Sequence, residues 1–264
     1  MLVYELVPGG NLDKRLHSPD PEQLLTWEER FEIALGLGSA LCYLHTEVEQ
    51  YCVVHGDIKS SNVLIDSSGQ AKLEDFGLAR LLHHGADPRT TEVVAGTIGY
   101  IDPEFVNSRR PCAESDVYSF GVLLLEIASG RRPTPPAGRP GGASARSSRP
   151  GGASACGDAR RTCPRYVWPE RRLDAADVRL GGDFEEMEME RVLVTGLWCA
   201  HPDSSQRPSM VQVMSFLRPE DAELRVPPAH RVLELETSHG STRSSLASTT
   251  YHTPPDSGYL MTDQ

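Results

Sequence analysis

The 264-residue sequence predicts an α+β fold that is mostly helical, and three observations support this prediction. Apolar residues recur with a helical period over residues 27–48. A second apolar stretch, residues 115–129, is bounded like a buried helix. Between them, residues 51–82 contain short β-favouring runs separated by polar turns. We therefore expect small strands and loops on a platform of helices.

The helix over residues 27–48 is expected to begin at a capping box, because Thr26 precedes Glu29 by the required spacing. Its apolar face comprises Phe31, Ala34, Leu37, Leu41 and Leu44. Gly36 and Gly38 lower its helix propensity, so packing against other elements must hold it.

The later helices are predicted from their caps and periodicity. For residues 115–129 we expect Ser115 at the N-cap and Gly130 as the residue that ends the helix. Two more helices are expected over residues 185–199 and 209–217.

Composition and charge exclude several classes of protein. Asp and Glu number 37 against 26 Lys and Arg, a net charge of −11, whereas nucleic-acid binding depends on clustered positive charge. The strongly apolar stretch 117–128 is shorter than the roughly 20 residues that cross a bilayer. The start of the chain has no secretory-signal pattern, and the six scattered cysteines are typical of reduced thiols. We expect no nucleic-acid partner and no transmembrane segment in this chain.

Residues 131–164 differ sharply from the rest of the chain. They are dominated by Arg, Pro, Gly, Ala and Ser, contain no Leu, Ile, Val or aromatic residue, and repeat the seven residues 139–145 at 149–155. Such a segment cannot bury enough apolar area to offset its chain entropy, so we expect disorder. Residues 219–264, rich in Ser, Thr and Pro, are expected to form a flexible tail.

The chemistry-bearing residues are Asp57, Lys59, Asn62 and Asp75. Asp57 and Asn62 lie on one loop, and Asp75 precedes a Phe-Gly pair that permits close backbone approach. Taken alone, an Asp–Asn pair on a loop commonly caps turns or helices. Together the four residues suit phosphoryl transfer. One carboxylate accepts a hydroxyl proton, Asn62 and the other carboxylate hold Mg²⁺, and Lys59 stabilises the transferring phosphoryl group.

These residues resemble the catalytic loop (H-R-D-x-K-x-x-N) and magnesium loop (D-F-G) of protein kinases, here residues 55–62 and 75–77. The further matching motifs are Gly96-Thr97-Ile98-Gly99-Tyr100, Asp102-Pro103-Glu104, Ser115-Asp116-Val117-Tyr118-Ser119-Phe120-Gly121 and Gln206-Arg207-Pro208. The sequence as a whole is similar to plant receptor-like kinases of the L-type lectin-domain type. Examples are the segments Leu2-Val3-Tyr4-Glu5 and Gly196-Leu197-Trp198-Cys199. The resemblance covers residues 1–130 and 170–218.

The resemblance implies a protein-kinase-like α+β fold. This chain would hold its mostly α-helical C-terminal lobe, with the small N-terminal lobe essentially absent. The expected organisation is a hinge-strand remnant (1–10), a C-lobe part with the catalytic and activation segments (11–130), a low-complexity disordered insert (131–165), the remaining C-lobe helices (166–218) and a flexible tail (219–264).

The implied function is that of an ATP-dependent serine/threonine protein kinase with Mg²⁺ as the metal and a protein Ser/Thr hydroxyl as the acceptor. Asp57 would be the catalytic base, with Lys59 beside the γ-phosphate and Asn62 and Asp75 on the metal. Thr97 would belong to the substrate platform. The family's kinases act on the cytoplasmic side of the plasma membrane, held there through the parent receptor.

The resemblance also implies a nucleotide site. Tyr4 would be the gatekeeper, the Glu5 carbonyl and Val7 N–H would read the adenine edge, and Leu64 would close the adenine pocket. Asp13 would reach the ribose. On chemistry alone, Tyr4 and Leu64 equally suit a core, and Asp13 suits a favourable charge at a helix N-terminus.

Supporting contacts follow from the same resemblance. His55 and Phe76 would stack, Asp116 would anchor the catalytic loop, and Arg207 would pair with Glu104.

The sequence departs from the family in three respects. Gly56 replaces the arginine that receives a phosphorylated residue, so a phosphate on Thr90 or Thr91 would find no partner there. The three lysines, at 14, 59 and 72, all follow the hinge, and none can align the α- and β-phosphates. Residues 131–165 stand where the family has its G helix; an incorrect reading frame or splice would explain both this segment and the missing lobe. We expect weak or no catalysis, with a non-catalytic kinase-like protein-binding module as the alternative.

Overall fold

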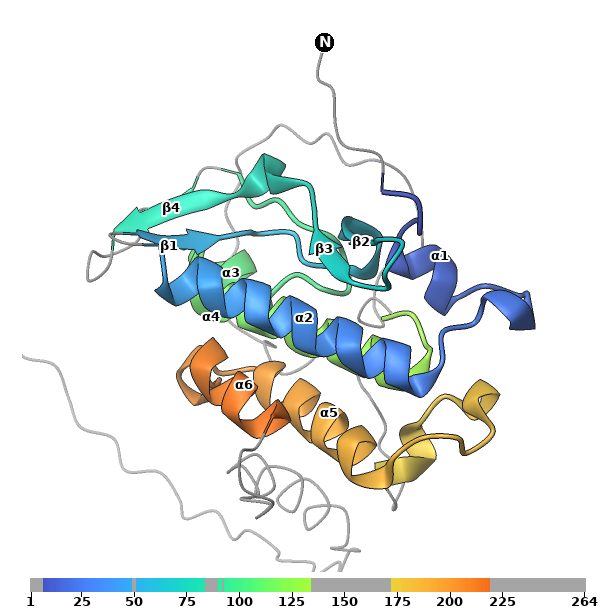
Figure 1. Cartoon of the computed structure of the whole chain (residues 1–264). Coiled ribbons are helices and arrows are strands. Elements are labelled where there is room, and N and C mark those ends of the chain that lie inside the picture. The colour runs from blue at the N-terminus through green and yellow to red at the C-terminus, as the bar shows by residue number, and fades with distance from the viewer. Residues whose placement is uncertain (1–6, 49–50, 84–89, 92, 134–171, 219–264) are drawn as a thin grey trace, which may run out of the picture. The chain divides into compact units, whose positions relative to one another are not determined.

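The computed structural model describes residues 7–48, 51–83, 90–91, 93–133 and 172–218 (Figure 1). Within these ranges the α-helices are α1 (Leu12–Leu16), α2 (Trp27–Thr46), α3 (Pro103–Ser108), α4 (Ala113–Ser129), α5 (Glu186–Cys199) and α6 (Met210–Leu217). The strands are β1 (Tyr51–Val54), β2 (Val63–Ile65), β3 (Ala71–Leu73) and β4 (Arg80–His83). The described part is mostly helical with few strands, as predicted. Residues 1–6 of the predicted hinge-strand remnant, most of the predicted insert and the whole predicted tail lie outside the described residues.

Helix α2 begins at the predicted capping box. The Thr26 hydroxyl oxygen accepts from the Glu29 N–H at 3.3 Å, and the Glu29 carboxylate accepts from the Thr26 N–H at 2.9 Å. Gly38 lowers the helix propensity of α2, but it also makes room for packing. A Cβ at this position would lie 2.5 Å from the Met214 sulfur of α6. The glycine therefore lets α6 approach α2 closely, and Figure 1 shows the two helices side by side.

Helix α4 is the buried centre of the fold, and every residue from Ser115 to Ser129 is buried. The prediction of Ser115 as its N-cap is wrong: the N-cap is Cys112, and the Ser115 hydroxyl instead donates to Asp102 at 3.0 Å. Gly130 ends the helix in the left-handed conformation (φ 63°), as predicted. Helix α5 packs against α4, and a Cβ on Gly121 would lie 2.6 Å from the Ala200 backbone nitrogen.

The strands form two antiparallel pairs. β1 pairs with β4, with Tyr51 opposite His83 and Val54 opposite Arg80. β2 pairs with β3, with Val63 opposite Leu73. β1, β2 and β3 match predicted apolar runs, whereas β4 was not predicted as a separate strand. Because β1 ends at Val54 and β2 begins at Val63, the two pairs hold both ends of the loop between them.

A buried cluster of charges joins residues 172–180 to the helices. The Asp177 carboxylate lies 2.9 Å from Arg30 Nη2 and 2.7 Å from Arg179 Nη2. Arg30 also donates to the Ile127 carbonyl of α4 at 3.0 Å. Burial tends to raise the pKa of Asp177, but hydrogen bonds from Arg179 and Arg30 outweigh it and lower that pKa overall. The cluster holds the chain that follows residue 171 against α2 and α4.

Candidate active site

The loop from His55 to Asn62 is fixed from below by one carboxylate of α4. Asp116, whose exposed fraction is 1%, accepts from the backbone N–H of His55 at 2.7 Å and of Gly56 at 2.9 Å. The His45 imidazole of α2 lies 3.1 Å from the same carboxylate. This confirms Asp116 as the anchor of the loop, since both backbone groups are hydrogen-bonded to it.

Three side chains converge on the carboxylate of Asp57. Lys59 Nζ donates to its Oδ2 at 2.6 Å, and the Thr97 hydroxyl donates to its Oδ1 at 2.7 Å. Lys59 also donates to the Thr97 hydroxyl at 2.9 Å, so the three groups form a closed triangle. Asn62 Nδ2 donates to Asp57 Oδ2 at 3.2 Å and to its carbonyl at 2.9 Å. The structure thus brings Asp57, Lys59 and Asn62 together, with Thr97 among them.

The surroundings keep Asp57 ionised. Partial burial alone tends to raise the pKa of this carboxyl group, but the hydrogen bonds from Lys59, Thr97 and Asn62 outweigh burial and lower the pKa below its ordinary value. At neutral pH the group is therefore an anion that accepts hydrogen bonds from three side chains, and an ionised carboxylate is the form that can accept a proton.

Asp75 adopts a backbone conformation that is uncommon for a residue with a side chain. Its φ is 62° and its ψ is 65°, in the left-handed region, and its carboxylate accepts from the Gly77 N–H at 3.3 Å. Such strain persists where the surrounding structure over-determines it, and it concentrates at functional sites. The side chain is exposed, so its oxygens are open to a ligand.

Backbone contacts place Asp75 beside the loop. The Glu74 N–H donates to the Asn62 carbonyl at 2.9 Å, and the Glu74 carbonyl lies 3.0 Å from His55 Nε2. The rings of His55 and Phe76 meet edge to face with centroids 4.7 Å apart. The two rings are in contact, but edge to face and not stacked as predicted. Asp75 lies between two residues that touch the loop.

The predicted nucleotide-binding residues are only partly described. Tyr4 and Glu5 lie outside the described residues, and Val7 is half-buried. Leu64 lies in β2, also half-buried, and forms a β-bridge with Asn11. The Gly10 carbonyl accepts from the neighbouring Ile65 N–H at 2.9 Å, so residues 10–11 run along the strand that carries Leu64.

Asp13 has protein partners of its own. It lies in the first turn of α1, where a carboxylate is favourable, and both of its oxygens accept from the Arg132 guanidinium. The Ser60 hydroxyl lies 3.5 Å from Asp13 Oδ1. This arrangement fits the interpretation of Asp13 as a helix charge.

Gly56 stands where the resemblance implies an arginine and lines a small cavity, although a Cβ there would lie 3.2 Å from the Leu78 carbonyl oxygen. Its φ is 83°, and a cavity of about 40 Å³ lined by Gly56, Asp57, Arg80 and Thr97, among others, lies beside it. Arg80 Nη2 donates to the Thr91 hydroxyl at 3.1 Å. Position 56 supplies no charge near Thr91, but an arginine from β4 does.

The predicted pairing of Arg207 with Glu104 is present but secondary. The two side chains are 3.9 Å apart, whereas Arg207 binds Asp102 through two hydrogen bonds of 2.9 and 2.8 Å. Asp102 also caps α3 by accepting from the Glu104 N–H at 2.9 Å. The sequence interpretation missed Asp102, although an Asp directly before a Pro is a recognisable start of a helix.

Comparison with known proteins identifies the family. A sequence model described as "Protein kinase domain" matches residues 1–216. The chain belongs to the protein kinase family. This kinase domain is 42% identical over 250 residues to the L-type lectin-domain containing receptor kinase IX.2 of Arabidopsis thaliana, covering 91% of this chain and 35% of the relative. It is 46% identical over 218 residues to the L-type lectin-domain containing receptor kinase S.7 of Oryza sativa subsp. japonica, covering 82% of this chain and 28% of the relative.

These relatives are receptor kinases by name, and this kinase domain spans 28 to 35% of their length. In the described part of the chain, no helix combines the length and the apolar character needed to cross a bilayer.

Proposed function

We propose that this kinase domain transfers the γ-phosphoryl group of Mg-ATP to a serine or threonine hydroxyl of a protein. The observation that carries the proposal is the triangle of Asp57, Lys59 and Thr97, with bonds of 2.6, 2.7 and 2.9 Å. Asp57 accepts the proton of the attacking hydroxyl. The oxygen of that hydroxyl bonds to the γ-phosphorus, and the bond from the γ-phosphorus to ADP breaks. Lys59 stabilises the charge on the transferring group, and Thr97 positions Asp57 and the acceptor.

Asn62 and Asp75 are the residues that we propose for Mg²⁺. Asn62 turns its amide nitrogen toward Asp57, which leaves the amide oxygen as a metal ligand, and Asp75 offers an exposed carboxylate. Oxygen ligands of this kind fit Mg²⁺, which usually takes one or two carboxylates together with water and phosphate oxygens. Bound Mg²⁺ neutralises charge on the phosphates.

For the nucleotide we propose Glu5, Val7 and Leu64 around the adenine and Asp13 near the ribose. The run of residues 10–11 along β2 supports the place of Leu64 beside the hinge segment. Asp13 reaches a ribose only if it exchanges its Arg132 contact for the sugar.

The chain is proposed to comprise a hinge remnant (1–10), C-lobe residues 11–130 and 166–218, an insert (131–165) and a tail (219–264). Assayed alone it should transfer phosphate slowly, because its lysines at 14, 59 and 72 do not supply the family's strand lysine. The names of the relatives support a place on the cytoplasmic side of the plasma membrane, through a parent receptor.

Thermal unfolding of the purified chain with and without millimolar Mg-ATP tests the proposal. A ligand that binds only the folded state stabilises it by about 1 kcal/mol or more once its concentration exceeds several Kd. We expect a rise in Tm that requires both Mg²⁺ and ATP and disappears in Asp75→Ala. Asp66→Ala, which removes a half-buried carboxylate from the β2–β3 turn, is the control and should keep the rise.

The rival function is a non-catalytic kinase-like module that binds partner proteins. The position of the three lysines favours it for this chain taken alone. An unchanged Tm at millimolar Mg-ATP would contradict our proposal and support this module.

A further inference from the structure

A carboxylate lies fully buried within the apolar helix α4. Glu126 has an exposed fraction of 0%, and its neighbours Leu124, Leu125 and Ile127 belong to the hydrophobic core. A buried carboxylate is costly unless hydrogen bonds satisfy it. The contacts of Glu126 therefore show what offsets that cost.

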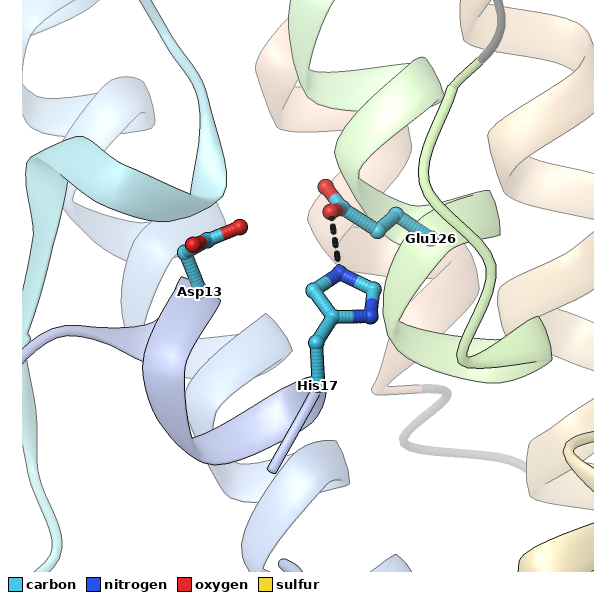
Figure 2. A group of neighbouring side chains, drawn as sticks. All are labelled: Asp13, His17 and Glu126. Carbon is cyan, nitrogen blue, oxygen red and sulfur yellow. Dashed lines mark hydrogen bonds and ion pairs between the residues drawn. The ribbon is translucent and has the colours of Figure 1, made fainter. Parts of the chain in front are cut away.

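Glu126 accepts from hydroxyl groups of two different segments. Its Oε2 accepts from the Tyr100 hydroxyl at 2.5 Å, and its Oε1 accepts from the Ser60 hydroxyl at 3.0 Å. The two hydroxyl oxygens lie 3.1 Å from each other. The His17 imidazole approaches Oε1 at 2.8 Å from the end of α1, as Figure 2 shows. Burial and the adjacent carboxylate raise the pKa of Tyr100, so its hydroxyl stays a donor.

The same cluster has the composition of a cation site, but its atoms are already engaged. Ligand atoms of Asp13, His17 and Glu126 lie within 4.8 Å of one another (Figure 2). The Arg132 guanidinium holds both oxygens of Asp13, and the protein donors above hold both oxygens of Glu126. The arrangement is that of a hydrogen-bond centre.

The two hydroxyl donors belong to the segments that form the Asp57 triangle. Ser60 directly follows Lys59, and the Tyr100 N–H donates to the Thr97 carbonyl at 3.0 Å. One carboxylate therefore joins the segment that carries Lys59 to the segment that carries Thr97.

We infer that Glu126 is a positioning residue of the phosphoryl-transfer site, which holds the substrate-side segment 97–100 on the catalytic loop through Tyr100 and Ser60, with His17 orienting its carboxylate. The catalytic role of Glu126 rests on the proposed function. Its structural role, holding residues 97–100 on the catalytic loop, can be measured without any enzymatic turnover.

Amide hydrogen exchange of the full chain tests that structural part. Tyr100→Phe removes only the hydroxyl group, and a net hydrogen bond to a charged acceptor corresponds to a roughly tenfold or larger change in an equilibrium constant. We expect roughly tenfold faster exchange in residues 57–62 and 97–101, with the rate in α4 residues 117–125 unchanged. Thr195→Val is the matched control, because the buried Thr195 hydroxyl of α5 has no hydrogen-bond partner within the described residues. It should leave both segments unchanged.

His17 provides a rescue test. His17→Ala should accelerate exchange in the same two segments, and His17→Gln, whose amide can still donate to Glu126, should restore most of the protection. Label transfer from Mg-ATP is measured on the same proteins. Tyr100→Phe should lower kcat at least several-fold with KM for Mg-ATP unchanged, because the Tyr100 hydroxyl is hydrogen-bonded to Glu126 and Ser60 and to none of the described residues that we propose for the nucleotide.

The outcomes separate the two proposals. Exchange rates in Tyr100→Phe equal to wild type, or accelerated equally in α4, would overturn the positioning role. A wild-type chain that transfers no label contradicts the proposed function, while the exchange result still decides for or against Glu126.

Discussion

The floor of the site and its open rim are built in different ways. The floor, residues 55–62 with Asp116, is held by buried hydrogen bonds, two of them from backbone N–H groups to Asp116 at 2.7 and 2.9 Å. The rim, residues 75–81, exposes apolar side chains, with Phe76 exposed by 47% and Leu81 by 65%. Asp75 on this rim receives one backbone hydrogen bond of 3.3 Å.

This difference shows which side chains of the site are held by other protein groups and which remain accessible to a ligand. The floor satisfies its own polar groups, so Asp57 keeps its geometry without a ligand. The rim leaves a carboxylate and apolar surface accessible, so we expect ligands to act there. Substitutions in the floor should therefore change stability, and substitutions in the rim should change binding.

The largest stability effect is expected from the buried ion pair of Asp102 and Arg207. Asp102→Ala leaves the Arg207 guanidinium buried without its carboxylate, which should cost about 3–5 kcal/mol of unfolding free energy. Urea denaturation measures this loss. Glu104→Ala is the control: its side chain is 46% exposed and 3.9 Å from Arg207, and it should cost about 1 kcal/mol or less. Equal losses in the two variants would show that Glu104 contributes as much as Asp102 and would contradict the assignment of Asp102 as the main partner.

A smaller effect is expected from acid. The pKa of Asp177 is lowered in the folded protein, because hydrogen bonds from Arg179 and Arg30 outweigh burial. A lowered folded pKa gives stability that is complete above the unfolded value, about 3.9, and is lost as pH falls through the folded pKa. Urea midpoints measured from pH 6 to pH 2 should therefore fall more steeply for wild type than for Asp177→Asn. Parallel curves would show that Asp177 does not contribute in this way.

The smallest stability effect is expected on the rim. Leu81→Ala should change the free energy of unfolding by about 0.5 kcal/mol or less, since surface substitutions rarely do more. Leu124→Ala in α4 makes the same chemical change in the core and should cost about 2–5 kcal/mol. A comparable loss at Leu81 would mean that the rim is packed in solution.

Local signals predicted the longer helices α2, α4, α5 and α6, whereas the short helices α1 and α3 were not predicted. The predicted Thr26–Glu29 capping box forms, and Ser209–Gln212 forms a second capping box that was not predicted. The prediction of Ser115 as an N-cap was wrong for a non-local reason. The Ser115 hydroxyl donates a hydrogen bond to Asp102, thirteen positions earlier, and α4 already begins at Ala113.

The candidate site was predictable where a motif carries it. Asp57, Lys59 and Asn62 meet as their spacing predicts, and Asp116 anchors their loop. Their roles in catalysis and metal binding stay predictions. The partners of Asp102 and Glu126 could not be assigned from sequence, because they lie far away along the chain. The available signal for Glu126 was a charge inside the apolar stretch 117–128.

The central claim is that Asp57 acts as the base in phosphoryl transfer. Its most direct test is transfer of label from γ-labelled Mg-ATP to dephosphorylated casein by the wild-type chain and by Asp57→Asn. We expect slow transfer by wild type and a rate lower by about 10²–10⁴-fold in Asp57→Asn, the range that a general base contributes. Equal rates for the two proteins, or no transfer by wild type, would contradict the account.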